Sequence, residues 1–118
     1  MLRNIQYGTY FNDAAEVLLK DNGFSSQIQS LDNDNLNAKK LDAGRIDLWI
    51  GGHLMLPFLI KKEGLNLSDF TSVYLVKETQ MYIAFNKNSS DEVVKRWQTA
   101  LDAMKADGSY DAIVKKFQ

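Results

Sequence analysis

Residues 45–53 read Arg-Ile-Asp-Leu-Trp-Ile-Gly-Gly-His, and this stretch decides the fold. Residues 45–50 are apolar enough to form a central strand that is buried on both faces of a parallel sheet. Gly51 and Gly52 predict a turn. Residues 53–62 then predict a helix, with Pro57 in its first turn, where a missing N–H does no harm. A strand that passes through a glycine turn into a helix is the repeating unit of an α/β fold.

The same alternation extends to both sides of this stretch. Apolar spacing and glycine positions predict strands at 3–7, 26–31, 72–77 and 81–86, and helices at 11–22, 35–43, 89–107 and 109–116. Gly8 is expected to end the first strand, and Ser89 with Glu92 has the spacing of a capping box. The order predicts a single α/β lobe of three layers, with a mostly parallel sheet flanked by helices and two C-terminal helices.

Composition narrows the class of function. The 118 residues fit one domain, and a net charge of −1 gives no reason to expect a nucleic-acid partner. No cysteine is present and there is one histidine, so thiol chemistry is excluded and no metal site or cofactor is expected. No paired carboxylates or nucleophile–base set stands out, so we expect no enzymatic activity. The longest apolar run, residues 54–60, is too short to cross a bilayer, and residues 1–30 lack the pattern of a signal peptide.

The first candidate site is Tyr7-Gly8-Thr9-Tyr10. Open α/β sheets bind ligands beyond the carboxyl ends of their strands. Gly8 would allow the backbone to approach a ligand, and Thr9 and Tyr10 would offer hydroxyls and amides to a carboxylate or another anion. The alternative is purely structural, with Gly8 as a turn and Thr9 as a helix N-cap.

The second candidate site is Gly51-Gly52-His53, where the glycines leave room and His53 stands at the mouth of the cleft. The alternative is a lone histidine that caps a helix or bonds locally. Neither glycine site has a phosphate-binding fingerprint. For the other polar and aromatic residues we expect structural roles. Asp32, Asp34 and Asp42 are expected to be helix caps or solvated charges, and Arg45 and Asp47 to form a local pair. Trp49 and Trp97 are expected to lie in the core.

Three stretches together resemble a known family. Residues 41–47, Leu-Asp-Ala-Gly-Arg-Ile-Asp, look like an "L-x-x-G-R-x-D" element. Residues 81–87 followed by 100–113 resemble a strand ending in lysine and then "A-L-x-x-x-K-A-D-G-[ST]-Y-D-x-I". With the opening Gly8-Thr9 turn, these motifs are similar in order and spacing to the bacterial periplasmic solute-binding proteins of the polar amino-acid type.

That resemblance implies a two-lobed fold of type II that closes on its ligand. Residues 1–80 would be the second lobe, and residues 81–118 a crossing strand and the helices that normally complete the first lobe. Ligand-binding residues would be Gly8, Thr9, Tyr10, Gly52 and His53. Gly52 stands where the family usually has an aspartate for the ligand's ammonium group. The arginine that grips the carboxylate lies in the main body of the first lobe, which has no counterpart here.

The resemblance therefore implies a partial solute-binding protein of an ABC-type transporter for an amino acid or another small polar solute. Its partner would be a membrane permease, and its place the periplasm. Three alternatives remain: the input domain of a sensor, a small enzyme that uses the related fold for lyase chemistry with His53 as its single acid–base candidate, and a ligand-free remnant of the fold. The C-terminal helices carry an apolar face without its usual partner sheet, so that face is expected to be covered by the lobe or by a second chain. Cover by a second chain, through exchange of the C-terminal segment, would give a homodimer.

Overall fold

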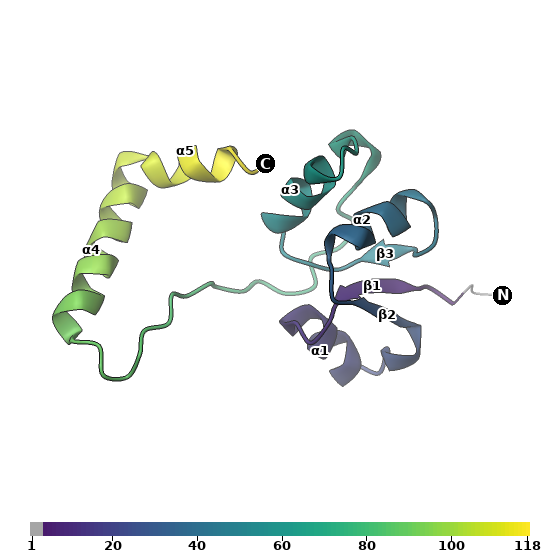
Figure 1. Ribbon diagram of the computed structural model, residues 1–118, viewed down its shortest axis with the longest axis horizontal. Helices are drawn as coiled ribbons and strands as arrows, with labels where there is room; N and C mark the ends of the chain where they lie inside the picture. Colours follow the sequence, from purple (N-terminus) through teal and green to yellow (C-terminus); the bar gives the residue numbers. More distant parts are fainter. Residues whose placement is uncertain (1–3) are drawn as a thin grey trace. The chain divides into compact units, whose positions relative to one another are not determined.

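The structure is a computed structural model that describes residues 4–118 in two compact units, divided between Thr71 and Ser72. The first unit has the α/β architecture predicted from the sequence, and the second consists of an extended segment and two helices (Figure 1). The predicted domain boundary between residues 80 and 81 falls nine residues later in the chain and stays a prediction. The two units are described separately below.

A parallel sheet of three strands forms the centre of the first unit, with the order β2-β1-β3. β1 spans Tyr7–Tyr10, β2 spans Ile28–Leu31 and β3 spans Leu48–Trp49. Tyr7 of β1 lies opposite Ile28 on one side and Leu48 on the other. The predicted fold class, a lobe with a parallel sheet and flanking helices, is confirmed.

β1 begins later than the sequence predicted. The predicted strand covered residues 3–7, of which Arg3 lies outside the described residues, and Gly8 was expected to end it. The strand instead runs through Gly8, and the reason is packing. A Cβ atom on Gly8 would lie 2.4 Å from Cδ1 of Ile46 and 2.7 Å from Oδ1 of Asn37. Glycine therefore permits close approach of neighbouring side chains within the strand, rather than a turn after it.

Three helices accompany the sheet, and their positions follow the predicted order. α1 spans Ala14–Asp21, α2 spans Asn35–Asp42 and α3 spans Met55–Lys62. α1 lies on one face of the sheet and α2 on the other, with α3 packed beside α2 (Figure 1). An ion pair of 2.6 Å joins Lys39 of α2 to Glu63, which follows α3. Short 3₁₀ turns occupy Ser25–Gln27 and Leu67–Asp69.

The strand around Trp49 is the edge of the sheet and not its centre, which corrects the expectation for residues 45–50. Its ladder contains two residues, both half-buried. No further strand pairs with its outer side among the residues that the structure describes. Among the strands of residues 4–118, β1 is the central one, because it pairs with β2 on one side and with β3 on the other.

The core of the first unit is small and partly polar. Ile46 is 2% exposed, and Ala38 is completely buried. Three polar side chains are also completely buried, namely Thr9, Glu16 and Asn37. Since a buried polar group is costly without hydrogen bonds, these three residues direct attention to the contacts around them.

The second unit contains the clearest failure of the strand predictions. Neither residues 72–77 nor residues 81–86 form a strand, and Ser72–Asn86 carries no helix. The local sequence favours extended backbone, but a strand also needs a partner for its N–H and C=O groups. Within the described residues this segment has no such partner in a sheet. Most of its large apolar side chains are exposed, Met81 to 91% and Tyr82 to 83%.

Two helices follow this segment, as predicted. α4 spans Asp91–Asp107 and α5 spans Ser109–Lys115. Ser90, one residue after the predicted Ser89, is the N-cap of α4, and its hydroxyl accepts a hydrogen bond from the Val93 N–H. Gly108 takes φ +82° and separates the two helices.

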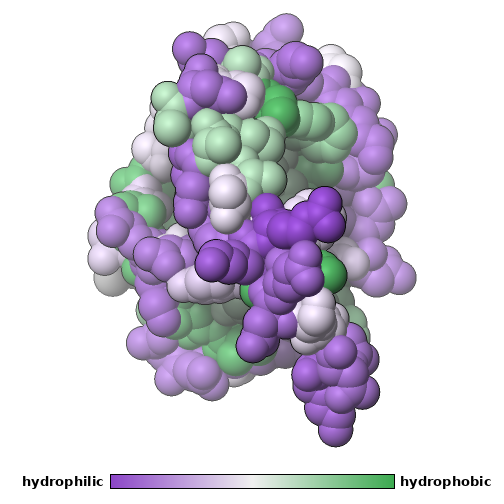
Figure 2. Space-filling view, turned by 90° about the vertical axis from the view of Figure 1, so that its left-hand side faces the viewer, coloured by the Kyte–Doolittle hydropathy of each residue, from purple (hydrophilic) through white to green (hydrophobic). Residues whose placement is uncertain are grey.

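No residue of α4 or α5 is buried, although both helices are amphipathic. Trp97 is 57% exposed and stacks edge-on against Phe85, with 6.3 Å between the ring centroids. Figure 2 shows hydrophobic residues at the surface between hydrophilic ones. In the described part of the chain, no helix combines the length and apolar character needed to span a bilayer.

Candidate functional site

The carboxyl ends of β1 and β3 form the edge at which the sequence placed a binding site. The two strands are parallel neighbours, so Tyr10 at the end of β1 and the residues after Trp49 leave the sheet at the same edge. The pairing continues past the ladder, because the Ile50 N–H donates to the Gly8 carbonyl over 3.2 Å. Both sequence-predicted glycine motifs are thus brought to one edge of one sheet.

Thr9 lies at this edge but faces the interior. Its side chain is fully buried, and its hydroxyl donates to Oε2 of Glu16 over 2.6 Å. Its carbonyl accepts from Nδ2 of Asn37 over 3.0 Å. Thr9 is not the N-cap of the following helix, since Asp13 holds that place and accepts from the Glu16 N–H. Its polar side chain is occupied inside the lobe, and its role in binding stays a prediction.

Tyr10 is the residue of the first motif that reaches solvent. It is 43% exposed, at the end of the central strand. Its carbonyl accepts from the Asp13 N–H over 3.2 Å, which fixes the turn between β1 and α1. Asn12 within that turn takes a positive φ of 58°, a conformation that asparagine tolerates better than most residues. The turn therefore presents the Tyr10 side chain from a backbone that is held at both ends.

Gly52 and His53 are both exposed at the start of α3. The Gly52 carbonyl accepts from the N–H groups of Met55 and Leu56, at 2.9 and 3.0 Å, so it starts the helix. A Cβ on Gly52 would meet nothing within 4 Å, whereas one on Gly51 would lie 2.7 Å from Leu56. Gly51 therefore lies against the end of the Leu56 side chain, and Gly52 is the glycine that borders open space.

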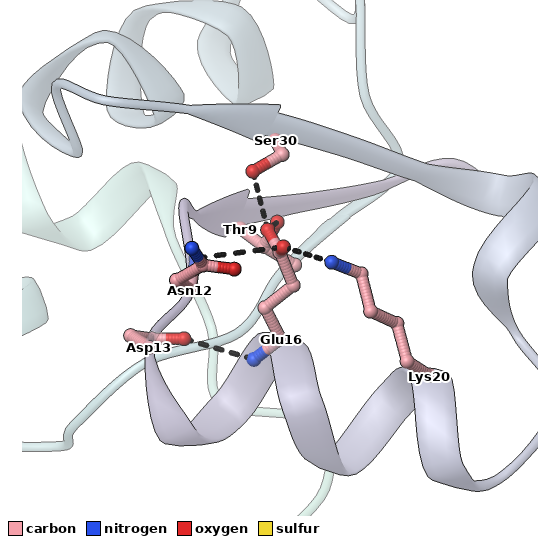
Figure 3. Close-up of polar contacts among 6 residues, drawn as sticks. All are labelled: Thr9, Asn12, Asp13, Glu16, Lys20 and Ser30. Carbon is pink, nitrogen blue, oxygen red and sulfur yellow. Dashed lines mark hydrogen bonds and ion pairs between the residues drawn. The ribbon is translucent and has the colours of Figure 1, made fainter.

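A buried carboxylate lies directly behind this edge (Figure 3). Glu16 of α1 accepts hydrogen bonds from the Thr9 hydroxyl of β1, the Ser30 hydroxyl of β2 and the ammonium group of Lys20. The Asn12 N–H adds a long contact of 3.5 Å. Glu16 therefore joins two strands to the helix at their carboxyl ends, and it fixes the backbone from which Tyr10 projects.

The charge on Glu16 is stabilised within this cluster. Burial by itself raises the pKa of a carboxyl group, but the hydrogen bonds from Lys20, Ser30, Thr9 and the Asn12 backbone outweigh it and lower the pKa of Glu16 from 4.5 to about 2. The carboxylate is ionised at neutral pH, and all its bonding partners are donors. It acts as a structural anchor, with no proton to exchange near pH 7.

Sequence reasoning missed Glu16. Residues 11–22 were assigned to a helix by their apolar positions, and Glu16 was given no role. Two signals pointed to it: Asp13 and Glu16 have the spacing of a capping box, and Lys20 follows at i+4. Ser30 lies on another strand, so its share of the cluster depends on the register of the sheet.

On the opposite face, a second set of contacts ties β1 and β3 to α2. Asn37 donates to the Thr9 carbonyl and also to Oδ1 of Asp34, over 2.9 Å. The same Asp34 oxygen accepts from the Trp49 indole over 2.8 Å. Asp34 occupies the N-cap position of α2, as predicted, but its side chain bonds to these groups and does not cap the helix. Trp49 is half-buried rather than a core residue.

The remaining predicted polar residues have local structural contacts or lie at the surface. Asp47 accepts from the Gln6 N–H over 2.9 Å, which joins the start of β3 to the start of β1. Asp32 and Asp42 are exposed. Among residues 4–118, no group of three or more acidic or histidine side chains could hold a metal ion. An open hollow of about 420 Å³ lies on α4, lined by Val93, Arg96, Trp97 and Ala100.

Comparison with known proteins gives one match. The family model described as "Bacterial extracellular solute-binding proteins, family 3" matches residues 10–118, which includes Tyr10, Gly52, His53 and both C-terminal helices. Gly8 and Thr9 precede the matched residues. No curated protein and no solved structure matches the chain.

Proposed function

The chain belongs to the bacterial extracellular solute-binding proteins of family 3, and from this premise we propose that residues 4–71 form one wall of a solute-binding cleft. The observation that carries the proposal is the shared carboxyl edge of β1 and β3, which brings Tyr10, Gly52 and His53 together. The proposed function is binding without catalysis, since the chain has a single histidine and no cysteine and its sequence offers no nucleophile–base set.

The chemistry of this edge suits a small polar solute. The Tyr10 phenol and the His53 imidazole can each donate or accept a hydrogen bond. The open space at Gly52 leaves room for a ligand, but glycine cannot supply the carboxylate that would pair with an ammonium group. We therefore propose an amino acid or a similar polar solute whose tighter contacts come from a facing surface. One wall alone is expected to bind weakly.

In this proposal the protein serves an ABC-type transporter from the periplasm. Solute-binding proteins of this kind close around their ligand and present it to a membrane permease. The apolar faces of α4 and α5 would be covered in the working protein, by the lobe or by a second chain exchanging its C-terminal helices. Gly52 favours one other candidate, a ligand-free member of the family, because the open position lacks a charged contact for a solute.

Nuclear magnetic resonance titration of the labelled chain with amino acids and organic acids tests the proposal. We expect weak binding, with shift changes concentrated at Tyr10, Gly52 and His53. A double variant, Tyr10→Ala with His53→Ala, should abolish these changes. The matched control is Lys61→Ala on the exposed side of α3, which should leave them unchanged. Absence of localised shifts for every solute would favour the ligand-free candidate.

A further inference from the structure

Asp34 lies at the same carboxyl edge of the sheet as Tyr10. It follows the last residue of β2 by three positions, and β2 runs parallel to β1. The chain segments after these two strands stay together past the ladder, because the Phe11 N–H donates to the Leu31 carbonyl over 2.8 Å. The half-buried carboxylate of Asp34 is therefore part of the edge to which the solute is assigned.

One oxygen of the Asp34 carboxylate is held by two donors. Its Oδ1 accepts from the Trp49 indole over 2.8 Å and from Nδ2 of Asn37 over 2.9 Å. Asp34 occupies the N-cap position of α2, but its side chain makes no capping hydrogen bond. Asp13, at the same position of α1, does cap its helix, through the Glu16 N–H. The Asp34 side chain is thus diverted from the role that aspartate ordinarily has at the start of a helix.

The amide that holds Asp34 is retained at a cost in stability. Asn37 is completely buried, and its Nδ2 donates both to Asp34 and to the Thr9 carbonyl. Its Oδ1 is buried and has no hydrogen-bond partner among the described residues. A buried acceptor without a partner is destabilising and rare, and such exceptions are expected at functional sites. The useful half of this amide is Nδ2, which fixes the Asp34 carboxylate against the end of β1.

The surroundings of Asp34 within the first unit are acidic or neutral. Three loops leave this edge of the sheet, at residues 11–13, 32–34 and 50–54, and none of them contains a lysine or an arginine. Both groups that bond to Oδ1 are neutral donors. The lysines of this unit that form ion pairs contact Glu16 and Glu63 instead. A carboxylate with a fixed orientation in such surroundings suits a cationic group on the solute, because charge-assisted hydrogen bonds are the strong ones.

We propose that Asp34 binds an ammonium group, so that the wall formed by this edge recognises small organic amines. Oδ2, which neither Trp49 nor Asn37 uses, makes the charge-assisted contact, and Tyr10 and His53 contact the rest of the solute. An ammonium group fits better than Ca²⁺ or Mg²⁺, because these ions require about six oxygen ligands and Asp34 is a single carboxylate. This inference rests on the proposed function, since it assigns a chemical group of the solute to the same edge.

Asp34 also bears on the ligand-free candidate. That candidate was favoured because the open position at Gly52 lacks a charged contact for a solute. Asp34 supplies a charged contact from the loop after β2, at the same carboxyl edge. The position of the charge differs from that of Gly52, so the two alternatives predict different results with charged and uncharged probes.

Matched probes test the proposal on the full chain by nuclear magnetic resonance. We expect propylammonium chloride to shift the Trp49 indole N–H and the Asn37 side-chain amide, because both bond to the Asp34 carboxylate. Neither 1-propanol nor sodium propionate should do so, and sodium chloride at the same concentration is the blank. Trp97→Phe identifies the Trp49 signal, since the chain has two tryptophans.

Two results in this titration would overturn the proposal. One is the absence of shifts at Trp49 and Asn37 with propylammonium at about 50 mM, where millimolar affinities saturate. The other is an equal response to 1-propanol. Either result would leave the proposed function standing if amino acids or organic acids still shifted Tyr10 and His53. Loss of those shifts as well would overturn both.

A substitution at Asp34 separates charge from geometry. Asp34→Asn keeps an oxygen for Trp49 and Asn37 and removes the charge, and it should weaken propylammonium binding about tenfold or more. Asp32→Asn is the matched control, because Asp32 is an exposed carboxylate on the same loop, and it should change the affinity by less than about twofold. Equal losses in the two variants would contradict a specific contact, since the general charge of the loop would then account for binding. If Asp34→Asn does not fold, the comparison of charged and uncharged probes on the wild type decides.

Discussion

The stretches around Trp49 and Tyr74 have similar strand-forming sequences and different fates. Residues 45–50 contribute a strand to the sheet, because β1 lies within reach in the same unit. Residues 72–77 form no strand among the described residues, and Tyr74 is 78% exposed. The α4 helix beyond them forms regardless, since a helix satisfies its backbone within itself. The comparison teaches that local sequence suffices for a helix, whereas a strand requires a second segment.

Hydrogen exchange should give the largest contrast between the two units. In solutions dilute enough for single chains, amides of β1 are expected to exchange at least about a thousandfold more slowly than those of residues 73–76. The reason is that β1 is bonded on both sides, and residues 73–76 have no ladder. Equal exchange rates in both segments would remove the distinction.

A substitution at Gly8 should disrupt the first unit. Gly8→Ala adds a Cβ against Ile46 and Asn37, which are buried and have little space to move, and we expect a loss of about 2–3 kcal/mol in the free energy of unfolding. Gly52→Ala is the matched control. It has open space and no positive φ, so a change within about 0.5 kcal/mol is expected. Urea unfolding followed by Trp49 fluorescence measures both.

Replacing Glu16 should loosen the carboxyl edge of the sheet from α1. Glu16→Gln keeps the shape but removes the charge that Lys20, Thr9 and Ser30 donate to, and the expected cost is about 2 kcal/mol. Glu63→Gln, which removes the ion pair with the largely exposed Lys39, should cost less than about 1 kcal/mol. Similar losses in the two variants would contradict the anchoring role of Glu16.

The contribution of Glu16 to the free energy of unfolding should depend on pH. The pKa of Glu16 is lowered from 4.5 to about 2 in the folded chain, so its contribution to stability is present above pH 4.5. That contribution is expected to disappear as the pH falls from 4.5 toward 2, where the folded form also takes up the proton. The stability difference between wild type and Glu16→Gln, measured from pH 6 to pH 2.5, should shrink over this interval. A constant difference would rule out the lowered pKa.

The smallest effect is expected in the second unit, at the cap of α4. Ser90→Ala removes the hydroxyl that accepts from the Val93 N–H over 3.4 Å, at an expected cost of about 0.5–1 kcal/mol to the helix. Circular dichroism should show a slightly lower helix content. Ser89→Ala is the control and should change nothing, because Ser89 is not the cap. If Ser89→Ala lowered the helix content more than Ser90→Ala, Ser89 would be the cap, as the sequence predicted.

The sequence allowed prediction of those parts of the fold that depend on neighbouring residues. Helical spacing and glycines such as Gly108 located the helices to within a few residues, and the order of elements gave the parallel sheet. The position of β1 was missed because the requirement for glycine at position 8 comes from Ile46 and Asn37, far along the chain. Residues 72–77 were assigned a strand from local pattern, and no local pattern reveals whether a partner is present.

The candidate site was predictable in place but not in detail. Both glycine motifs do reach one edge of the sheet, as parallel topology requires. The inward orientation of Thr9 and the burial of Glu16 could not be derived, because they depend on which face of β1 meets α1. The hydrogen bond from the Thr9 hydroxyl to Glu16 shows which face of β1 packs against α1. It can be recognised only once the fold is known.

The direction of β1 determines on which side of the sheet the residues ahead of Tyr7 lie. The chain enters the sheet at Tyr7, at the opposite end of β1 from Tyr10. A linker or fluorescent group attached ahead of β1 would therefore leave from the far edge of the sheet, with Tyr10 and His53 directed away from it. In a surface-based binding measurement, attachment at this end would therefore not itself cover the candidate binding edge of the first unit.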